Sequence, residues 1–197
     1  MVQWGAAIGR MHAARRNYAH PESIHSRPQW DQERNYVRIQ NNLDRHDGKM
    51  RAWFRRLDPW LKALPKSGSD YGLIHADVHH GNFHVNDRDE VTVFDFDDCH
   101  YHWFAYDIAV PIFSLTHALA RKGAKFDWSR LSAAFWTGLS SENQYSAACI
   151  EAVDRFVEFR SLVMYYWCAS NLGRADLDDK SREWMEKTMT YCLELAF

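Results

Sequence analysis

From Phe104 to the C-terminus, apolar residues recur at helical spacing with few breaks, and no other feature constrains the fold as strongly. A stripe of this kind buries one face of a helix against a core. The pattern predicts four helices, over residues 104–121, 128–140, 144–172 and 177–196. A domain built around them is mainly helical and has room for only a small sheet.

The N-terminal part of the chain contributes further helices. Apolar residues at helical spacing from Trp4 to Met11 predict a helix that begins almost at the first residue. A stronger stripe from Met50 to Leu64 predicts another helix, which Pro65 ends. Between them, residues 19–30 contain two prolines and several turn formers, which predicts a loop, and a further helix is expected from Asp31.

Short strands are predicted only in the middle of the chain. The segment from Tyr71 to His75 is apolar without a helical period, so it is predicted to be a buried strand. The segments 82–86 and 90–96 flank a three-residue turn and predict a hairpin. The whole chain, residues 1–197, is therefore expected to form a single domain, α+β and mainly helical, with a short β hairpin.

Charge and cysteine content exclude several classes of protein. A net charge of −2 gives no indication of a nucleic-acid surface. The most apolar region, from Tyr101 to Ala120, contains Asp107, Pro111 and His117, which argues against a membrane span. The four cysteines form no CxxC pair, so neither a disulfide framework nor a zinc site is indicated, and with no N-terminal signal the expected location is the cytoplasm.

Histidines and aspartates gather around the predicted hairpin, and this is where chemistry is expected. His75, Asp77 and Asn82 have the spacing H-x-D-x-x-x-x-N, which the catalytic loop of kinases uses, and Asp95 opens a D-F-D triplet one hairpin later. Phosphoryl transfer requires a carboxylate that orients the attacking hydroxyl and accepts its proton, and oxygen ligands that hold Mg²⁺ against the nucleotide phosphates. Asp77 suits the first role, and Asn82 and Asp95 suit the second.

The predicted hairpin brings these three groups together. Asp77 lies in the loop after the first strand, Asn82 opens the next strand, and the returning strand brings Asp95 alongside. An H-x-D triplet alone is weak evidence, whereas the full spacing followed by a hairpin and D-F-D is specific.

The string LIHADVHHGNFHV, followed by VTVFDFDD and YDIA, resembles the aminoglycoside-phosphotransferase and choline-kinase-like family, whose loop usually has the pattern H-G-D-x-H-x-x-N. GRMHA near the start resembles the family's first helix after the linker between the two lobes, so the resemblance covers the whole chain. It implies that the chain is the helical C-terminal lobe of a protein-kinase-like fold.

The resemblance also implies roles for single residues. Asp77 becomes the catalytic base, Asn82 and Asp95 become magnesium ligands, and His75 becomes a structural residue that ties the loop to the core. His79 matches the second histidine of the family pattern. The implied reaction is an ATP- and Mg²⁺-dependent phosphoryl transfer to the hydroxyl of a small molecule.

Three further positions bear on the resemblance. Asp107 matches an aspartate that braces the catalytic loop in such kinases, although an acid in the first turn of a helix is equally explained by the helix dipole. Ala76 replaces the usual glycine, a mild change if the backbone there is not left-handed. Asp97 replaces the glycine of the protein-kinase D-F-G, and Asp97 or Asp98 would add negative charge near the metal.

The parts with which kinases hold ATP are not found before Trp4, and no G-x-G-x-x-G occurs in the sequence. The N-terminal ATP-binding lobe is therefore expected to be absent or supplied by a separate chain, and this polypeptide alone is expected to bind nucleotide poorly and to be inactive. Without that lobe, apolar surface near the first helix and from Tyr71 to Ile74 would be exposed, which predicts self-association into a homo-oligomer.

A zinc-dependent hydrolase is one alternative. It is suggested by the residues that are able to bind zinc in this region, namely His75, Asp77, His79, His80 and either Asp95 or Asp98. The remaining histidines lie in no comparable motif, which counts against it.

A kinase-like module that binds without catalysing is a second alternative. The missing lobe favours it, whereas the intact Asp77, Asn82 and Asp95 count against it, because a degenerate site is not expected to retain all three.

The acceptor is expected to bind the helices after the metal motif, which are rich in aromatic and acidic residues. The candidates are Tyr101, Trp103, Tyr106 and Glu158. Aromatic rings and carboxylates together hold a cationic amine or amino-alcohol, which fits an aminoglycoside, homoserine or choline-like acceptor, while a sugar or a protein hydroxyl stays open. Most aromatic residues of the long helix, Trp167 in particular, are expected to belong to the core.

Overall fold

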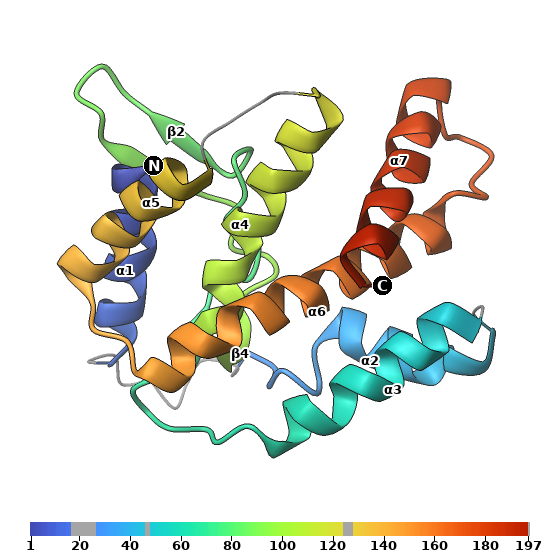
Figure 1. Cartoon of the computed structure of the whole chain (residues 1–197), viewed down its shortest axis with the longest axis horizontal. Coiled ribbons are helices and arrows are strands. Elements are labelled where there is room, and N and C mark those ends of the chain that lie inside the picture. The colour runs from blue at the N-terminus through green and yellow to red at the C-terminus, as the bar shows by residue number, and fades with distance from the viewer. Residues whose placement is uncertain (17–26, 46–47, 124–127, 197) are drawn as a thin grey trace.

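The computed structural model describes residues 1–16, 27–45, 48–123 and 128–196 (Figure 1). Most of the loop expected at residues 19–30 lies outside these ranges. In chain order the elements are α1 (Val2–Arg16), α2 (Arg34–Asn41), the 3₁₀ helix η1 (Leu43–Arg45), α3 (Gly48–Ala63), β1 (Tyr71–Ile74), β2 (Phe83–Val85), β3 (Val91–Val93), β4 (His100–Trp103), α4 (Phe104–Arg121), α5 (Trp128–Glu142), α6 (Ala147–Asn171) and α7 (Asp179–Ala196).

The predicted helices are confirmed to within one turn at each end. α4 spans the predicted range, and α3, α5, α6 and α7 differ from theirs by only a few residues. α2 begins at Arg34 rather than at Asp31, because Glu33 caps it: the Glu33 carboxylate accepts hydrogen bonds from the backbone N–H groups of Asn35 (2.7 Å) and Tyr36 (3.0 Å).

The strands of the described residues form two separate antiparallel pairs. β2 and β3 are the predicted hairpin, with Phe83 opposite Val93. β1 pairs with β4, a strand that the sequence did not predict, and Tyr71 lies opposite Trp103. β4 is short, carries two histidines and runs directly into α4. The alternation typical of a strand could therefore not be distinguished in the sequence from the periodicity of the helix.

α1 and α5 form one group of helices, and α4, α6 and α7 form another (Figure 1). α1 and α5 lie side by side at one edge of the molecule, next to the β2–β3 hairpin. α6 crosses the middle and packs against both α4 and α7, and its buried face includes Phe156, Phe159 and Leu162. One core therefore connects the helices that carry the site with those that support it.

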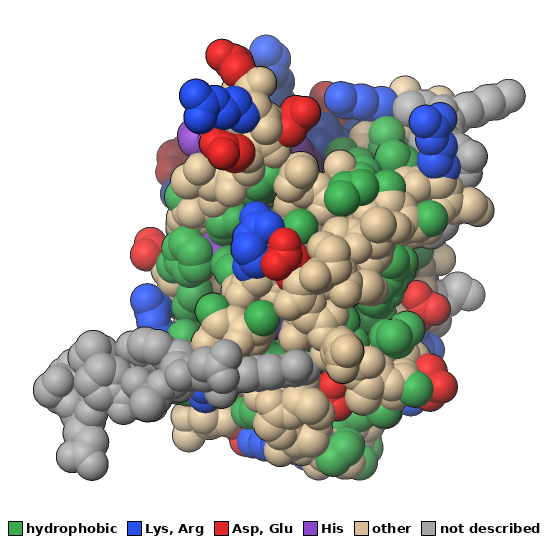
Figure 2. All heavy atoms as spheres, turned by 90° about the vertical axis from the view of Figure 1, so that its left-hand side faces the viewer, with side chains coloured by type: hydrophobic (Ala, Val, Ile, Leu, Met, Phe, Trp, Pro, Cys, Tyr) green, Lys and Arg blue, Asp and Glu red, His purple; other side chains and the backbone are tan. Residues whose placement is uncertain are grey.

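The packing of α1 against α5 covers surface that was expected to be exposed. Trp4 and Ile8 of α1 are buried, as is Ile74 of β1, whereas Val2 of α1 is exposed and Tyr71 is half-buried. Figure 2 faces this edge and shows hydrophobic side chains in separate groups between charged and other polar atoms. The apolar surface near α1 and β1 is thus smaller than expected, and self-association stays a prediction.

The cysteines and the helix lengths agree with the sequence analysis. Cys99, Cys149, Cys168 and Cys192 are all free and buried. Within the described ranges, every helix is too short or too polar to serve as a membrane span.

The contact between α1 and α5 gives a test of the packing. A Cβ atom at Gly5 would lie 2.1 Å from the carbonyl oxygen of Phe135 and 2.9 Å from the backbone nitrogen of Leu139, so Gly5→Ala must push the helices apart. We expect Gly5→Ala to lower the free energy of unfolding by about 2 kcal/mol, measured by urea denaturation. Gly173→Ala is the matched control, because a Cβ there meets no atom within 4 Å. Equal stability of the two variants would contradict this packing.

Candidate active site

The loop between β1 and β2, residues 75–82, holds its shape through short internal hydrogen bonds. The backbone N–H of His79 donates to the carbonyl of Asp77 (2.7 Å), and that of Asn82 donates to the carbonyl of His79 (2.9 Å). We call this segment the catalytic loop, after the kinase loop whose spacing it has. Its residues from His75 to Asn82 are the ones that the sequence pattern selected.

The catalytic loop is anchored by Asp107 in the first turn of α4. The Asp107 carboxylate is fully buried and accepts hydrogen bonds from the backbone N–H groups of His75 (3.2 Å) and Ala76 (2.8 Å). Its Oδ2 also lies 3.0 Å from Nε2 of His12 on α1. Burial opposes ionisation of this group, but the hydrogen bonds and the nearby histidines outweigh burial and lower the pKa of Asp107. The contacts of Asp107 therefore go beyond those of a residue that only complements a helix dipole.

His75 joins the catalytic loop to the hairpin. Its ring is buried, and Nε2 lies 3.0 Å from the carbonyl oxygen of Phe94. Its Nδ1 accepts a hydrogen bond from the backbone N–H of Asp77 (3.3 Å), and the ring packs against Phe96 with centroids 4.5 Å apart. These contacts are those expected of a structural residue.

The backbone at Ala76 is left-handed, so the replacement of the family's usual glycine by alanine is not a mild change. Its φ angle is +69°, in the left-handed region, where an L-residue with a Cβ atom is strained by about 1 kcal/mol. Ala76 is also buried, and its N–H is bonded to Asp107. The contacts around Ala76 thus hold a backbone conformation that glycine adopts more readily.

Asp77, the predicted base, lies at the surface of a pocket and is bonded through both oxygens. Oδ1 accepts a hydrogen bond from Nη2 of Arg160 at 2.6 Å. Oδ2 is held less closely, by Nδ2 of Asn82 at 3.2 Å and Nε2 of His79 at 3.5 Å. Burial lowers the pKa of His79, an effect that the charge of Asp77 partly opposes.

Arg160 on α6 was not among the residues selected from the sequence. Its side chain is 13% exposed, and it is also hydrogen-bonded to the hydroxyl of Tyr106. Burial by itself would lower the pKa of Arg160, but Tyr106 and Asp77 raise it, so the guanidinium is charged. An arginine between Phe159 and Leu162, within the buried stripe of a helix, was a usable signal, because a charge at such a position requires an acidic partner.

Asn82 and Asp95 lie on facing segments of the hairpin. The backbone N–H of Phe94 donates to the carbonyl of Asn82 (3.0 Å), so the register places Asp95 one residue beyond Asn82's partner. Nδ2 of Asn82 donates to both the carbonyl and the carboxylate of Asp77, which leaves the amide oxygen of Asn82 as the atom able to bind a metal. Asp95 is exposed with a φ of +66°, and strained backbone of this kind often occurs at functional sites.

The donor set fits a magnesium ion better than a zinc ion. An amide oxygen from Asn82 and a carboxylate from Asp95 are hard oxygen ligands, and Mg²⁺ usually takes only one or two such groups from the protein. In the part of the chain that the structure describes, no group of three or more His, Cys, Asp or Glu side chains is arranged to hold a metal. The zinc-dependent hydrolase therefore has no ligand cluster to support it there.

The two aspartates after Asp95 differ in their contacts. Asp97 is exposed, and its backbone carbonyl accepts a hydrogen bond from Nη1 of Arg27 (2.9 Å). Asp98 pairs with Nη2 of Arg34 on α2 at 3.1 Å. Asp98 lines the same pocket as Asp77, whereas Asp97 does not.

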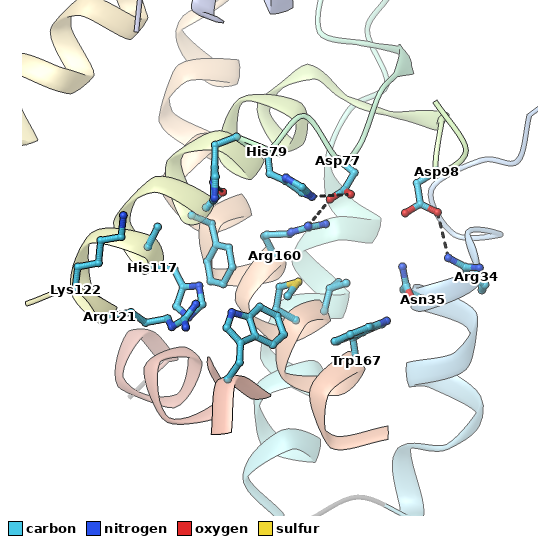
Figure 3. A pocket seen from close by; sticks show the side chains of 17 residues that line it. Arg34, Asn35, Asp77, His79, Asp98, His117, Arg121, Lys122, Arg160 and Trp167 are labelled. Atoms are coloured by element: carbon cyan, nitrogen blue, oxygen red, sulfur yellow. Dashed lines mark hydrogen bonds and ion pairs between the residues drawn. The ribbon is translucent and has the colours of Figure 1, made fainter. Parts of the chain in front are cut away.

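This pocket, the Asp77 pocket, has a volume of about 630 Å³ and lies between α2, α4, α6 and α7 (Figure 3). Its lining residues are Arg34, Asn35, Asp77, His79, His80, Asp98, Phe113, Ser114, His117, Ala118, Arg121, Lys122, Arg160, Val163, Met164, Trp167 and Trp184. In Figure 3, Asp77 and Arg160 lie between the end of α4 with Arg121 on one side and the pair Arg34–Asp98 on the other. Trp167 is 41% exposed and lines the pocket, so its assignment to the core is wrong.

The residues predicted to bind the acceptor lie outside the lining of this pocket. Trp103 is buried and donates through Nε1 to the carbonyl of Pro65, and the Tyr101 ring lies under Arg15. Tyr106 is buried and reaches the pocket only through its bond to Arg160. The Glu158 carboxylate forms an ion pair with Arg56 and accepts a hydrogen bond from Nε1 of Trp53, so it joins α6 to α3. The structure thus does not bring these four together with Asp77.

The anchoring role of Asp107 predicts a change in stability with pH. Because the pKa of Asp107 is lower in the folded than in the unfolded protein, the ionised carboxylate stabilises the fold above the unfolded pKa. That stability is lost as the pH falls below about 4 toward the folded pKa. In Asp107→Asn, we expect the free energy of unfolding to fall by about 3 kcal/mol at pH 7, because an amide nitrogen would replace one of the two oxygens that accept hydrogen bonds from the loop. Its dependence on pH below 4 should also be weaker.

Asp179→Asn is the matched control for this prediction. Asp179 is also an acid in the first turn of a helix, α7, but it is exposed. A helix-dipole effect alone predicts similar losses of about 0.5 kcal/mol in both variants. Urea denaturation between pH 2 and 7 distinguishes the two explanations, and similar small losses would contradict the anchoring role.

Comparison with known proteins agrees with this geometry. A model of the phosphotransferase enzyme family matches residues 1–138. Amicoumacin kinase from Bacillus subtilis (strain 168) is 30% identical over 163 residues, which cover 82% of this chain and 48% of that protein. The chain therefore spans about half the length of the curated relative that it matches.

Solved structures show the same fold. Amicoumacin kinase hAmiN in complex with AMP-PNP, Ca²⁺ and Ami aligns with a TM-score of 0.77 at 24% identity, covering 98% of this chain and 58% of that one. A microcompartment-associated aminopropanol kinase aligns with a TM-score of 0.64 at 20% identity, over 100% and 61% of the two chains. A choline/ethanolamine kinase family protein from Mesorhizobium loti gives 0.65 at 13% identity, over 96% and 61%.

These alignments confirm the predicted kinase-like fold, mainly helical with small antiparallel sheets. The family match covers the catalytic loop, the hairpin and Asp107 together, which are the parts that the sequence pattern selected. The chain belongs to the phosphotransferase enzyme family.

Proposed function

We propose that this chain carries the catalytic site of an ATP- and Mg²⁺-dependent kinase that phosphorylates a hydroxyl group of a small molecule. The observation that carries the proposal is the position of Asp77 at the surface of the pocket, where Arg160 and Asn82 hold its carboxylate. The relatives named as kinases of amicoumacin and aminopropanol support a small-molecule acceptor. The solved complex with AMP-PNP and Ca²⁺ supports a nucleotide and a divalent metal.

Asp77 orients the acceptor and receives its proton. Oδ1 is fixed by the short bond to Arg160, and the more loosely held Oδ2 is the oxygen available to the acceptor hydroxyl. The hydroxyl oxygen forms a bond to the γ-phosphorus as the bond from phosphorus to the β–γ bridging oxygen breaks. ADP leaves, and the hydroxyl proton passes to Asp77.

Asn82 and Asp95 would hold the metal through oxygen atoms of their side chains. A bound Mg²⁺ supplies charge neutralisation for the phosphate oxygens. Asn82 has a second task, because its Nδ2 bridges the carbonyl and the carboxylate of Asp77 and so fixes the base relative to the metal-binding oxygen. Catalysis in this arrangement is positioning and charge neutralisation.

The activity of the whole protein is part of the proposal, because the chain spans about half of its curated relative. The proposal also covers how the whole protein binds the nucleotide and whether a second chain or copy takes part in that binding. A cytoplasmic location is consistent with four free cysteines and with the use of ATP, and we include it here.

The base role is tested with Asp77→Asn in the gene product that contains these residues. We expect kcat for phosphate transfer from ATP to a panel of hydroxyl compounds to fall at least about 100-fold, because an amide cannot accept the proton. Asp154→Asn is the control, since Asp154 is an exposed acid on the same helix as Arg160. Transfer that is retained in Asp77→Asn would refute the base role, and nucleotide binding without any transfer by the native protein would favour the non-catalytic module.

The metal role is tested with Asp95→Ala. We expect the Mg²⁺ concentration for half-maximal transfer to rise about tenfold or more, because one of two protein ligands is lost. Asp87→Ala, in the exposed turn of the same hairpin, should leave the magnesium dependence unchanged. The measurement is a magnesium titration of the initial rate at saturating ATP, and identical titrations of the two variants would exclude Asp95 as a ligand.

A further inference from the structure

The charges that line the Asp77 pocket do not cancel. Its two acids are each paired with a cation, Asp77 with Arg160 at 2.6 Å and Asp98 with Arg34 at 3.1 Å. Arg121 and Lys122, at the C-terminal end of α4, also line the pocket. Among the described residues, neither has an ion pair with an acidic side chain.

The surroundings of Arg121 do not supply the missing negative charge. Glu183 on α7 is close enough for Arg121 to contribute to the lowering of its pKa, but the Glu183 carboxylate is bonded to Nζ of Lys187 at 2.5 Å. His117 faces the same end of the pocket, and burial, followed by the charge of Arg121, lowers its pKa to about 4, so it is neutral at pH 7. Among the described residues, this end of the pocket therefore has two cations, Arg121 and Lys122, that form no ion pair with an acid.

Two tryptophans line the pocket together with these cations. Trp167 of α6 and Trp184 of α7 meet edge to face with centroids 6.1 Å apart, and Arg121 lies 5.9 Å from the ring of Trp184. Trp167 is 41% exposed although it lines a pocket, which is unusual for so large an apolar side chain and suits a partner with a flat ring.

We propose that the acceptor combines a hydroxyl group with a planar aromatic part and an anionic group such as a carboxylate. The inference rests on the proposed kinase function, in which the hydroxyl lies at Asp77. The aromatic part then lies against Trp167 and Trp184, and the anionic group lies at Arg121 and Lys122. Polycationic aminoglycosides and choline-like amines are disfavoured as acceptors, because they would meet like charge at Arg121 and Lys122.

The placement of Glu158 supports this narrowing. A cationic acceptor needs a carboxylate that is free to receive it, and Glu158 was the candidate in the sequence. Its carboxylate is instead bonded to Arg56 and to the indole of Trp53, outside the lining of the pocket. Both acids that do line the pocket already have cationic partners.

Three compounds that share a ring and a hydroxymethyl group, and that differ in the charge of the group opposite it, test the proposal. They are 4-(hydroxymethyl)benzoate, the neutral 4-(hydroxymethyl)benzamide and the cationic 4-(hydroxymethyl)benzylamine, each with one ring and one primary hydroxyl. Binding to the gene product is measured by calorimetry at low ionic strength. We expect the benzoate to bind about tenfold more tightly than the amide, with the benzylamine weakest. A tighter complex with the benzylamine, or no saturable binding of any of the three at millimolar concentration, would overturn the proposal.

Variants locate the effect in the pocket. Arg121→Gln with Lys122→Gln should abolish the preference for the benzoate over the amide. The double variant Lys49→Gln with Lys180→Gln removes the same charge from exposed positions outside the pocket and should retain the preference. Trp167→Leu should weaken all three compounds alike, which its exposure allows without disturbing the core. An unchanged preference in the Arg121 and Lys122 variant would also overturn the proposal.

The failure of this inference can be told apart from the failure of the kinase function. If phosphate is transferred to kanamycin or choline and not to the benzoate, the kinase function holds and the anionic acceptor is wrong. The opposite outcome is that the benzoate binds most tightly, with this preference lost in the Arg121 and Lys122 variant, while no phosphate is transferred to any hydroxyl. In that case the anionic site holds and the kinase function fails.

Discussion

The buried carboxylate of Asp107 is the contact on which the geometry of the site depends. It is bonded to two backbone N–H groups of the catalytic loop and to His12 of α1, so three segments far apart in the chain meet at one charge. Leaving a buried N–H group unpaired costs about 1–3 kcal/mol, and an unpaired buried carboxylate costs more. The loop, α1 and α4 are therefore stable together in this arrangement, and the left-handed backbone of Ala76 persists within it.

The parts of the molecule that follow from local sequence were predictable. The helices after Phe104 have long apolar stripes, and the hairpin has a short turn between two apolar runs, so each is specified by neighbouring residues. The spacing of Asp77 and Asn82 was informative for the same reason, since a short loop brings them into hydrogen-bond contact whatever the rest of the fold.

The parts that depend on distant residues were missed. β4 exists because β1, about thirty residues earlier, offers it an edge, and four residues with two histidines do not indicate a strand by themselves. Arg160 contacts Asp77 across 83 positions of sequence. On the same helix, Glu158 lies two residues before Arg160 and Trp167 lies seven residues after it. Periodicity alone could not show that Glu158 faces α3 while Trp167 faces the pocket.

The chemistry of the site and the choice of its substrate are separated in this fold. In the proposed function, the catalytic loop and the hairpin supply the reactive groups, and the demands of phosphoryl transfer set their residues. The pocket is formed mostly by the ends and faces of α4, α6 and α7, where a residue such as Arg121 can change without disturbing Asp77 or Asn82. A single catalytic arrangement can thus serve acceptors of opposite charge, and the acceptor of this chain has to be inferred from the helices rather than from the catalytic motif.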